Sequence, residues 1–207
     1  MTRSLLALML AAALSGITAQ DVGAQASFVY DRELGDIARK TLRQAVTERA
    51  KPPLRSVLRV YVRCYRSRAS FERTFERRFG VPAGQVIAYY AGGGDVHLRG
   101  GTCVGVRAFL AGRHTVVTAA AFSVLLHEAL HRQGMRDERL ANCFANEAVR
   151  WGAEWLGFGE DRALAARDLA FSFTRRSRLP RTTSGCPTAS RSRDAGIGST
   201  TADATPA

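Results

Sequence analysis

The pattern of apolar positions predicts five main helices. Hydrophobic side chains return every three or four residues in each of five segments, which is the period of an amphipathic helix. Asp31 stands at an N-cap position, and Gly134 stands where a helix C-terminus usually closes. The predicted helices span Asp31–Ala50, Ala69–Phe79, Thr118–Gln133, Asp137–Leu156 and Asp161–Arg175, and a short helix is expected after Cys103.

Shorter apolar segments predict strands. The segment Val57–Tyr65 is rich in β-branched and aromatic residues. The segments Val86–Tyr90 and Val96–Leu98 flank three glycines and an aspartate, which is typical of a hairpin. We therefore expect an α+β fold with a small antiparallel or mixed sheet, in one domain over residues 27–179.

The predicted helix Thr118–Gln133 contains the sequence His127-Glu128-Ala129-Leu130-His131, an HExxH motif. Residues four apart lie on one helix face, so both imidazoles can bind the same metal ion. The intervening Glu128 projects toward the open side of that ion, where a catalytic base is needed. This arrangement is typical of zinc hydrolases, with His127 and His131 as candidate ligands and Glu128 as the candidate catalytic residue.

A zinc site of this kind needs a third protein ligand, and three acidic residues follow His131. Asp137 completes an HExxHxxGxxD spacing, although it also suits the N-cap of the next helix. Glu138 opens an ExxAN pattern in which Asn142, one turn later, could hydrogen-bond a ligand as a second-shell residue. Glu147 points to the opposite helix face from Glu138. We favour Glu138 and keep Asp137 as the alternative third ligand.

These residues also carry a resemblance. The stretch LLHEALHRQGMRDERLANCFANEAV, with VRCY and VHLRGGTC before it, resembles an uncharacterised family of secreted HExxH proteins of high-GC bacteria. Their helix pair is similar to that of minimal gluzincin zinc metallopeptidases, and the resemblance covers about residues 57 to 150. It implies a zincin-like fold, in which the sheet packs on the HExxH helix and a following glutamate helix. Only six residues separate the second His from Glu138, fewer than in well-known gluzincins, which keeps Asp137 open. The implied zinc ligands are His127, His131 and Glu138, with Glu128 as the base.

The motif predicts a zinc-dependent peptidase that acts on a peptide or protein substrate. Three protein ligands leave a fourth position for water, whose proton Glu128 would accept as the water attacks a carbonyl. The upstream hairpin could pair its strand edge with an extended peptide. A catalytically inactive protein with the zincin fold is an alternative. Candidates for a second electrophile are Tyr89, Tyr90, His97, His114 and the arginines of the cleft, among which the spacing does not select.

The two ends of the chain predict export and a tail. Arg3 precedes an apolar run in the first 26 residues, and Ala24-Gln25-Ala26 offers a cleavage site, so residues 1–26 are interpreted as a signal peptide. We expect a secreted, periplasmic or cell-envelope protein with no membrane span after signal removal. Residues 180–207 are rich in Arg, Ser and Thr and are expected to be mostly disordered.

Export determines how the four cysteines are interpreted. In an oxidising compartment, thiols form disulfides. The chain has no CxxC pair, which argues against a structural zinc site. We predict the disulfides Cys64–Cys103 and Cys143–Cys186, because each would join neighbouring parts of the domain.

The charge of the chain favours a different class of function. The 207 residues include 30 Lys and Arg against 18 Asp and Glu, a net charge of +12. A basic, polyanion-binding cell-envelope protein is therefore the alternative, and weak contact with envelope polyanions is a further expectation. No nucleic-acid-binding motif is present and the arginine clusters lack aromatic residues, so we expect no specific nucleic-acid partner.

Overall fold

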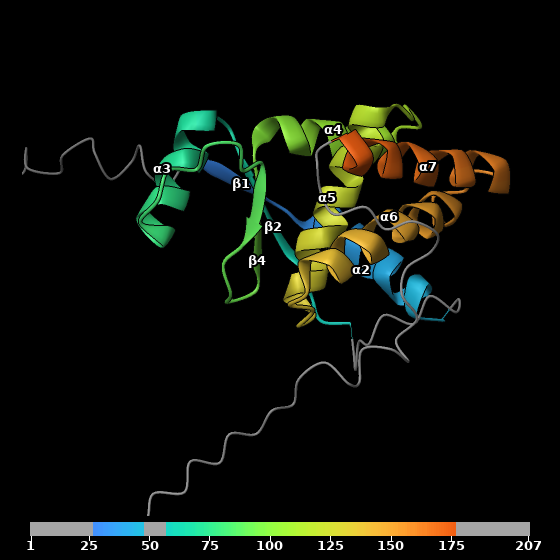
Figure 1. Cartoon of the computed structure of the whole chain (residues 1–207), viewed down its shortest axis with the longest axis horizontal. Coiled ribbons are helices and arrows are strands. Elements are labelled where there is room, and N and C mark those ends of the chain that lie inside the picture. The colour runs from blue at the N-terminus through green and yellow to red at the C-terminus, as the bar shows by residue number, and fades with distance from the viewer. Residues whose placement is uncertain (1–26, 48–56, 177–207) are drawn as a thin grey trace, which may run out of the picture.

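This computed structural model describes residues 27–47 and 57–176, in which the strands lie in the first half and four consecutive helices follow the last strand. The strands form one mixed sheet with helices on both faces, which confirms the predicted α+β class. Figure 1 shows α3 on one side of the sheet and the remaining helices gathered on the other. The predicted signal peptide and the predicted tail lie outside the described residues.

The sheet has the strand order β1-β2-β4-β3. Strand β2 pairs antiparallel with β1 and parallel with β4, whereas β3 and β4 form the predicted antiparallel hairpin. Three successive glycines, Gly92 to Gly94, take positive φ in the connecting turn, a conformation that favours glycine. Strand β1 was not predicted, and β2 begins four residues later than expected. The strands span Phe28–Asp31 (β1), Tyr61–Tyr65 (β2), Ala88–Tyr90 (β3) and Asp95–Leu98 (β4).

The five long predicted helices all occur, with small changes at their ends. Asp31 caps the first of them, accepting a hydrogen bond from the backbone N–H of Leu34 at 3.1 Å. The helix expected after Cys103 begins before this residue, at Gly100. None of the helices in the described residues is long and apolar enough to span a membrane. The helices span Arg32–Thr47 (α2), Arg68–Phe79 (α3), Gly100–Leu110 (α4), Val116–Arg132 (α5), Glu138–Trp155 (α6) and Glu160–Arg176 (α7).

Helix α5 runs through the main core, where its alanines and leucines are buried among α2, α4, α6 and α7. Glycines on the neighbouring helices permit this close approach. A Cβ atom on Gly152 would lie 2.5 Å from the ring of Phe122, and one on Gly105 would lie 2.7 Å from the Cβ of Ala121. The helix that carries the HExxH motif is therefore held rigidly from several sides.

A second, aromatic core lies between the sheet and α3. His97 stacks on Tyr89 at a centroid distance of 4.4 Å, and its Nδ1 lies 2.9 Å from the hydroxyl of Tyr65. Burial, with the nearby Arg63 charge, lowers the pKa of His97 to about 4. Burial also raises the pKa of the Tyr89 phenol. His97 is therefore a neutral, structural residue of this core at physiological pH.

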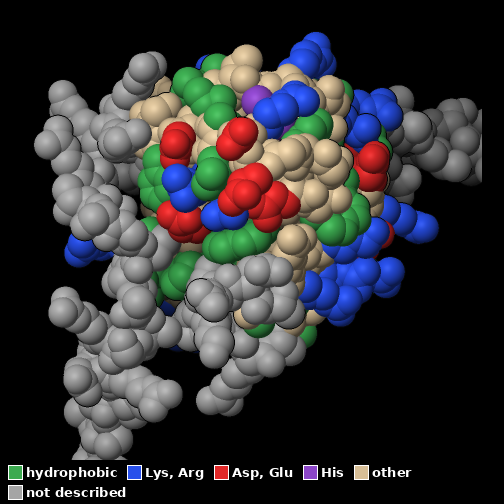
Figure 2. Space-filling model, turned by 90° about the vertical axis from the view of Figure 1, so that its right-hand side faces the viewer, with side chains coloured by type: hydrophobic (Ala, Val, Ile, Leu, Met, Phe, Trp, Pro, Cys, Tyr) green, Lys and Arg blue, Asp and Glu red, His purple; other side chains and the backbone are tan. Residues whose placement is uncertain are grey.

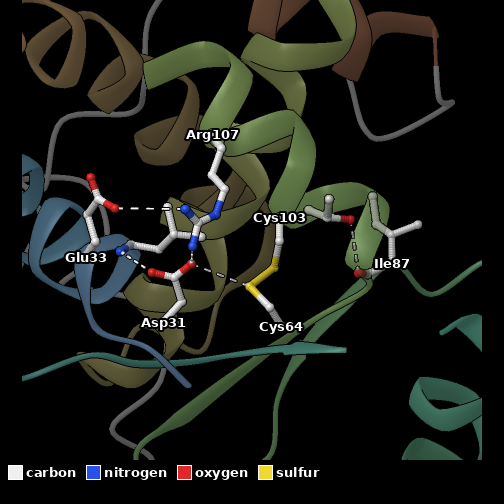
Figure 3. The surroundings of a disulfide bond; sticks show 8 residues. Asp31, Glu33, Cys64, Ile87, Cys103 and Arg107 are labelled. Atoms are coloured by element: carbon white, nitrogen blue, oxygen red, sulfur yellow. Dashed lines mark hydrogen bonds and ion pairs between the residues drawn. A yellow bond between two sulfur atoms is a disulfide. The ribbon is translucent and has the colours of Figure 1, made fainter. Parts of the chain in front are cut away.

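The predicted disulfide between Cys64 and Cys103 is confirmed, and it joins β2 to α4. Figure 3 shows Arg107 of α4 above this bond, directed toward the carboxylates of Asp31 and Glu33. The disulfide joins α4 to β2, and the ion pairs of Arg107 join α4 to the end of β1 and to α2. The second predicted pair, Cys143–Cys186, stays a prediction because Cys186 lies outside the described residues.

Charges of both signs mix on the face formed by the ends of α6 and α7. Figure 2 shows acidic side chains gathered there with arginines between them. Arg150 pairs with Glu154 at 2.7 Å and with Glu160 at 3.0 Å, so this face presents paired charges instead of a continuous basic surface. Most of the arginine clusters that suggested polyanion binding lie outside the described residues.

Candidate metal centre

The two ends of α5 are defined by local sequence. Thr115 and Thr118 form a capping box at the N-terminus, each hydroxyl accepting from the backbone N–H of the other residue. After Arg132 the chain turns through Gly134, whose φ of 94° favours glycine. The HExxH motif therefore occupies the last two turns of α5, directly before a tight connection to α6.

Helix α6 begins at Glu138 because Asp137 caps it. The Oδ1 atom of Asp137 accepts hydrogen bonds from the backbone N–H groups of Arg139 at 2.8 Å and Leu140 at 3.0 Å. This places Glu138 in the first turn of α6, next to the last turn of α5. The short connection thus brings the first carboxylate of α6 back to the HExxH face.

The side chains of His127, His131 and Glu138 converge on one point. The two Nε2 atoms lie 2.9 Å apart, and each lies 3.2 Å from a different carboxylate oxygen of Glu138. One ligand atom from each residue lies within 4.8 Å of the others, so this cluster could hold a metal ion. The histidines are mostly buried, whereas the Glu138 side chain is 70% exposed.

The spacing of these atoms fits a small tetrahedral ion. Nitrogen and oxygen ligands at zinc distances of about 2.0 to 2.2 Å lie roughly 3.3 to 3.6 Å from one another in a tetrahedron. The observed separations of 2.9, 3.2 and 3.2 Å are slightly shorter, so the histidines and Glu138 need little movement. Two imidazoles and one carboxylate are a donor set that suits zinc and other first-row transition metals better than magnesium or calcium.

Hydrogen bonding prepares His131 for this role. Its Nδ1 lies 2.6 Å from the backbone carbonyl of Met135, which can only accept, so Nδ1 is the donor and Nε2 is the ring nitrogen that faces the cluster. Burial, followed by the nearby His131, lowers the pKa of His127 to about 4, which keeps that imidazole neutral. The Nδ1 atom of His127 is buried and has no hydrogen-bond partner among the described residues.

Glu128 lies beside this cluster with only 9% of its surface exposed. Burial and the negative charge of Glu138 raise its pKa to about 8, and a backbone hydrogen bond from Tyr90 partly opposes that rise. A divalent cation held by the cluster would favour the ionised carboxylate. Glu128 is therefore a buried carboxylate with a displaced pKa beside the cluster, which makes it a candidate proton-transfer residue.

A pocket of about 620 Å³ opens onto the cluster. Strand β3 forms one wall and the α5–α6 connection forms another. Strand β3 is an edge strand, since it pairs only with β4 within the described sheet. The residues that line this pocket are Ala88, Tyr89, Tyr90, His127, Glu128, His131, Arg132, Gly134, Met135, Arg136 and Glu138.

Several predicted site residues are placed elsewhere. Asp137 uses its carboxylate as the helix cap, so the arrangement favours Glu138 as the third ligand. Glu147 lies on the α7 side of α6, 3.9 Å from Arg167, and burial raises its pKa. Asn142 is half-buried, and no described hydrogen bond links it to the cluster. His114 stacks on Phe109 away from the pocket, at a centroid distance of 4.6 Å.

The structure also reveals contributors that the motif did not indicate. The carbonyl of Met135 orients His131, and Ser123 ties the two ligand-bearing helices together by donating to Asn146 at 2.6 Å. Both lie outside the HExxH pattern, and backbone carbonyls leave no signal in sequence.

Comparison with known proteins does not identify a relative: no protein-family model, curated protein or solved structure matches this chain. The resemblance to minimal gluzincins consequently stays a prediction from the motif.

Proposed function

We propose that this protein is a zinc-dependent peptidase with a zincin-like fold. One observation carries the proposal: the metal-binding atoms of His127, His131 and Glu138 converge next to the buried carboxylate of Glu128, inside one pocket. The proposal needs both the three metal-binding residues and the carboxylate of Glu128, because metal ligands alone would be equally consistent with a structural metal site.

His127, His131 and Glu138 would hold the metal. Zinc bound by three protein ligands supplies Lewis acidity, which polarises a substrate carbonyl and makes water more acidic. Met135 keeps the lone pair of His131 directed at the cluster, and the Asp137 cap keeps Glu138 at the start of α6. Both supports come from the connection between the two helices.

Glu128 would move the proton. Its carboxylate accepts a proton from the attacking water as the water oxygen bonds to the carbonyl carbon, and it then gives this proton to the amide nitrogen as the C–N bond breaks. The products are a carboxylic acid and an amine, so no other reactant is needed. Glu128 lies beside Tyr90 and is largely buried, which suits its carboxylate to accepting and releasing a proton.

The edge strand supports a peptide as the substrate. Strand β3 lines the pocket and leaves one edge unpaired in the described sheet. An extended peptide could add to this edge through backbone hydrogen bonds, which would place a peptide bond above the cluster.

The proposal is tested by comparing the parent protein with Glu128→Gln, both loaded with one zinc ion. A fluorogenic peptide library should be cleaved by the parent, and Glu128→Gln should cleave it on the order of 100-fold more slowly or worse. Removing the metal with a chelator should abolish cleavage, and adding zinc should restore it. Equal rates for the two proteins would contradict the proposal. No cleavage by the zinc-loaded parent would favour the inactive zincin alternative.

A further inference from the structure

Two arginines line the metal pocket without carboxylate partners. Arg132 donates from Nε to the carbonyl of Arg59 at 3.3 Å, and Arg136 is exposed. Neither side chain forms an ion pair within the described part of the chain. Some arginines elsewhere in the fold do form ion pairs, as Arg99 does with Glu72 at 3.1 Å. The unpaired guanidinium groups at the pocket are therefore available to a ligand.

Both arginines line the same pocket as the cluster, and local contacts limit where they lie. The guanidinium of Arg132 lies against the glycine turn of the β3–β4 hairpin, 3.5 Å from where a Cβ on Gly94 would stand. Arg136 directly follows Met135, whose carbonyl contacts the ring of His131 at 2.6 Å. The backbone at Arg136 is thus tied to a metal ligand, so its side chain starts from a defined place at the rim.

With a divalent cation on the cluster, the charges of the pocket would not cancel. Its lining contains two carboxylates, Glu128 and Glu138, and two guanidinium groups, with both cluster histidines uncharged in the ligating state. A divalent cation on the cluster would balance the two carboxylates, which leaves the positive charge of both arginines uncompensated. A negatively charged group on the substrate would restore the balance, and arginine forms strong paired hydrogen bonds with carboxylates.

Building on the proposed function, we propose that Arg132 and Arg136 make the site selective for a substrate carboxylate close to the scissile bond. Two chemical sources of that carboxylate are compatible with the site: an acidic side chain next to the bond, or the free C-terminus of a short peptide. In either form the arginines act as specificity-determining residues, and they take no part in proton transfer.

The selectivity can be measured by binding, without turnover. The probes are short peptides that carry a zinc-chelating hydroxamate at one end and either Glu, Gln or Lys beside it, with an amidated C-terminus. A fourth probe combines Gln with a free C-terminal carboxylate. Dissociation constants are measured calorimetrically on zinc-loaded protein at about 0.15 M salt, where exposed charges more than about 8 Å apart are largely screened.

The Glu probe should bind roughly tenfold more tightly than the Gln amide probe if the side chain is recognised, and the Lys probe should bind weakest. If the terminus is recognised, the free-carboxylate probe should show that gain instead. The double variant Arg132→Gln/Arg136→Gln should reduce either preference to less than about twofold. The control Arg139→Gln removes an exposed arginine of α6 that does not line the pocket, and it should keep the full preference.

The outcomes separate this inference from the function on which it rests. Equal binding of all four probes would overturn the selectivity while supporting a metal-bearing site. A carboxylate preference that survives in the double variant would overturn the assignment to these arginines. Failure of every hydroxamate to bind zinc-loaded protein would contradict the proposed metal site, and the inference would fall with it. The single variant Arg136→Gln, at an exposed position, provides the same comparison should the double variant fold poorly.

Discussion

Adjacent residues at the start of α6 should respond in opposite ways to substitution. The Asp137 carboxylate accepts two backbone N–H groups, whereas Glu138 directs its carboxylate toward both histidines. Loss of such a cap costs about 1 kcal/mol, and in a domain of this size that lowers the melting temperature by about 2 to 4 °C. Asp137→Ala should therefore melt lower than the parent and still bind zinc.

Glu138→Ala should show the reverse behaviour. Its side chain is 70% exposed, so its loss should change the stability of the metal-free protein by less than about 0.5 kcal/mol. In the parent, free zinc at 100 times Kd should stabilise the fold by about 2.7 kcal/mol. Substitutions that only disturb the orientation of a metal ligand weaken metal binding by about 10- to 100-fold. Loss of a ligand should therefore weaken zinc binding by at least about 100-fold. At the same free zinc concentration the variant should then gain no more than about 0.4 kcal/mol.

The assay is thermal unfolding followed by circular dichroism, with and without buffered zinc. Asp137→Asn is the matched control, because Asn is also a good N-cap but has no carboxylate with which to bind zinc. It should keep both the parent's stability and its zinc-dependent shift. Loss of the zinc shift in Asp137→Asn, or its retention in Glu138→Ala, would refute the assignment of the third ligand.

Three other predictions concern the fold that supports the site. Replacing Cys64 and Cys103 by serine should destabilise the protein by about 4 kcal/mol in chemical denaturation, because the disulfide closes a loop with a sequence separation of 39; an unchanged midpoint would contradict this. His97 has a folded-state pKa of about 4 against 6.5 for the unfolded chain, so its own contribution to the free energy of unfolding should be fully present above pH 6.5 and fall by up to about 3 kcal/mol toward pH 4. His97→Phe should show a weaker pH dependence in that window than the parent. Gly152→Ala should be destabilising by about 1 to 3 kcal/mol, since its Cβ would meet the Phe122 ring at 2.5 Å, while Gly101→Ala, with open space around it, should not be.

The helices could be predicted because their signals are local. Periodic apolar residues, the Asp137 cap and Gly134 placed α5 and α6 to within two residues of their observed ends. The sheet could not be predicted in the same way. Strand β1 has four residues, and its pairing with β2 joins positions such as Phe28 and Tyr65 that are far apart in the chain. The parallel pairing of β2 with β4 is equally non-local, and no periodicity reveals it.

In the candidate site, too, the features with local sequence signals could be predicted and those that depend on the fold could not. Helical spacing placed His127 and His131 on one face, and it favoured Glu138 over its neighbour Asp137 only through Asn142, which no described hydrogen bond links to the cluster. That choice depends on where α6 begins, and the cap hydrogen bonds determine it. The arginines that line the pocket could not be predicted, for a different reason. Among 30 basic residues, only the fold shows which ones line the pocket without an acidic partner.

The most direct test of the metal centre is the zinc content of the purified protein, measured by elemental analysis beside His131→Ala. We predict one zinc ion per chain in the parent and loss of stoichiometric zinc in the variant, because His131 supplies one of the three converging ligand atoms. A parent protein that takes up no zinc, or a His131→Ala protein that retains it with unchanged affinity, would contradict the account.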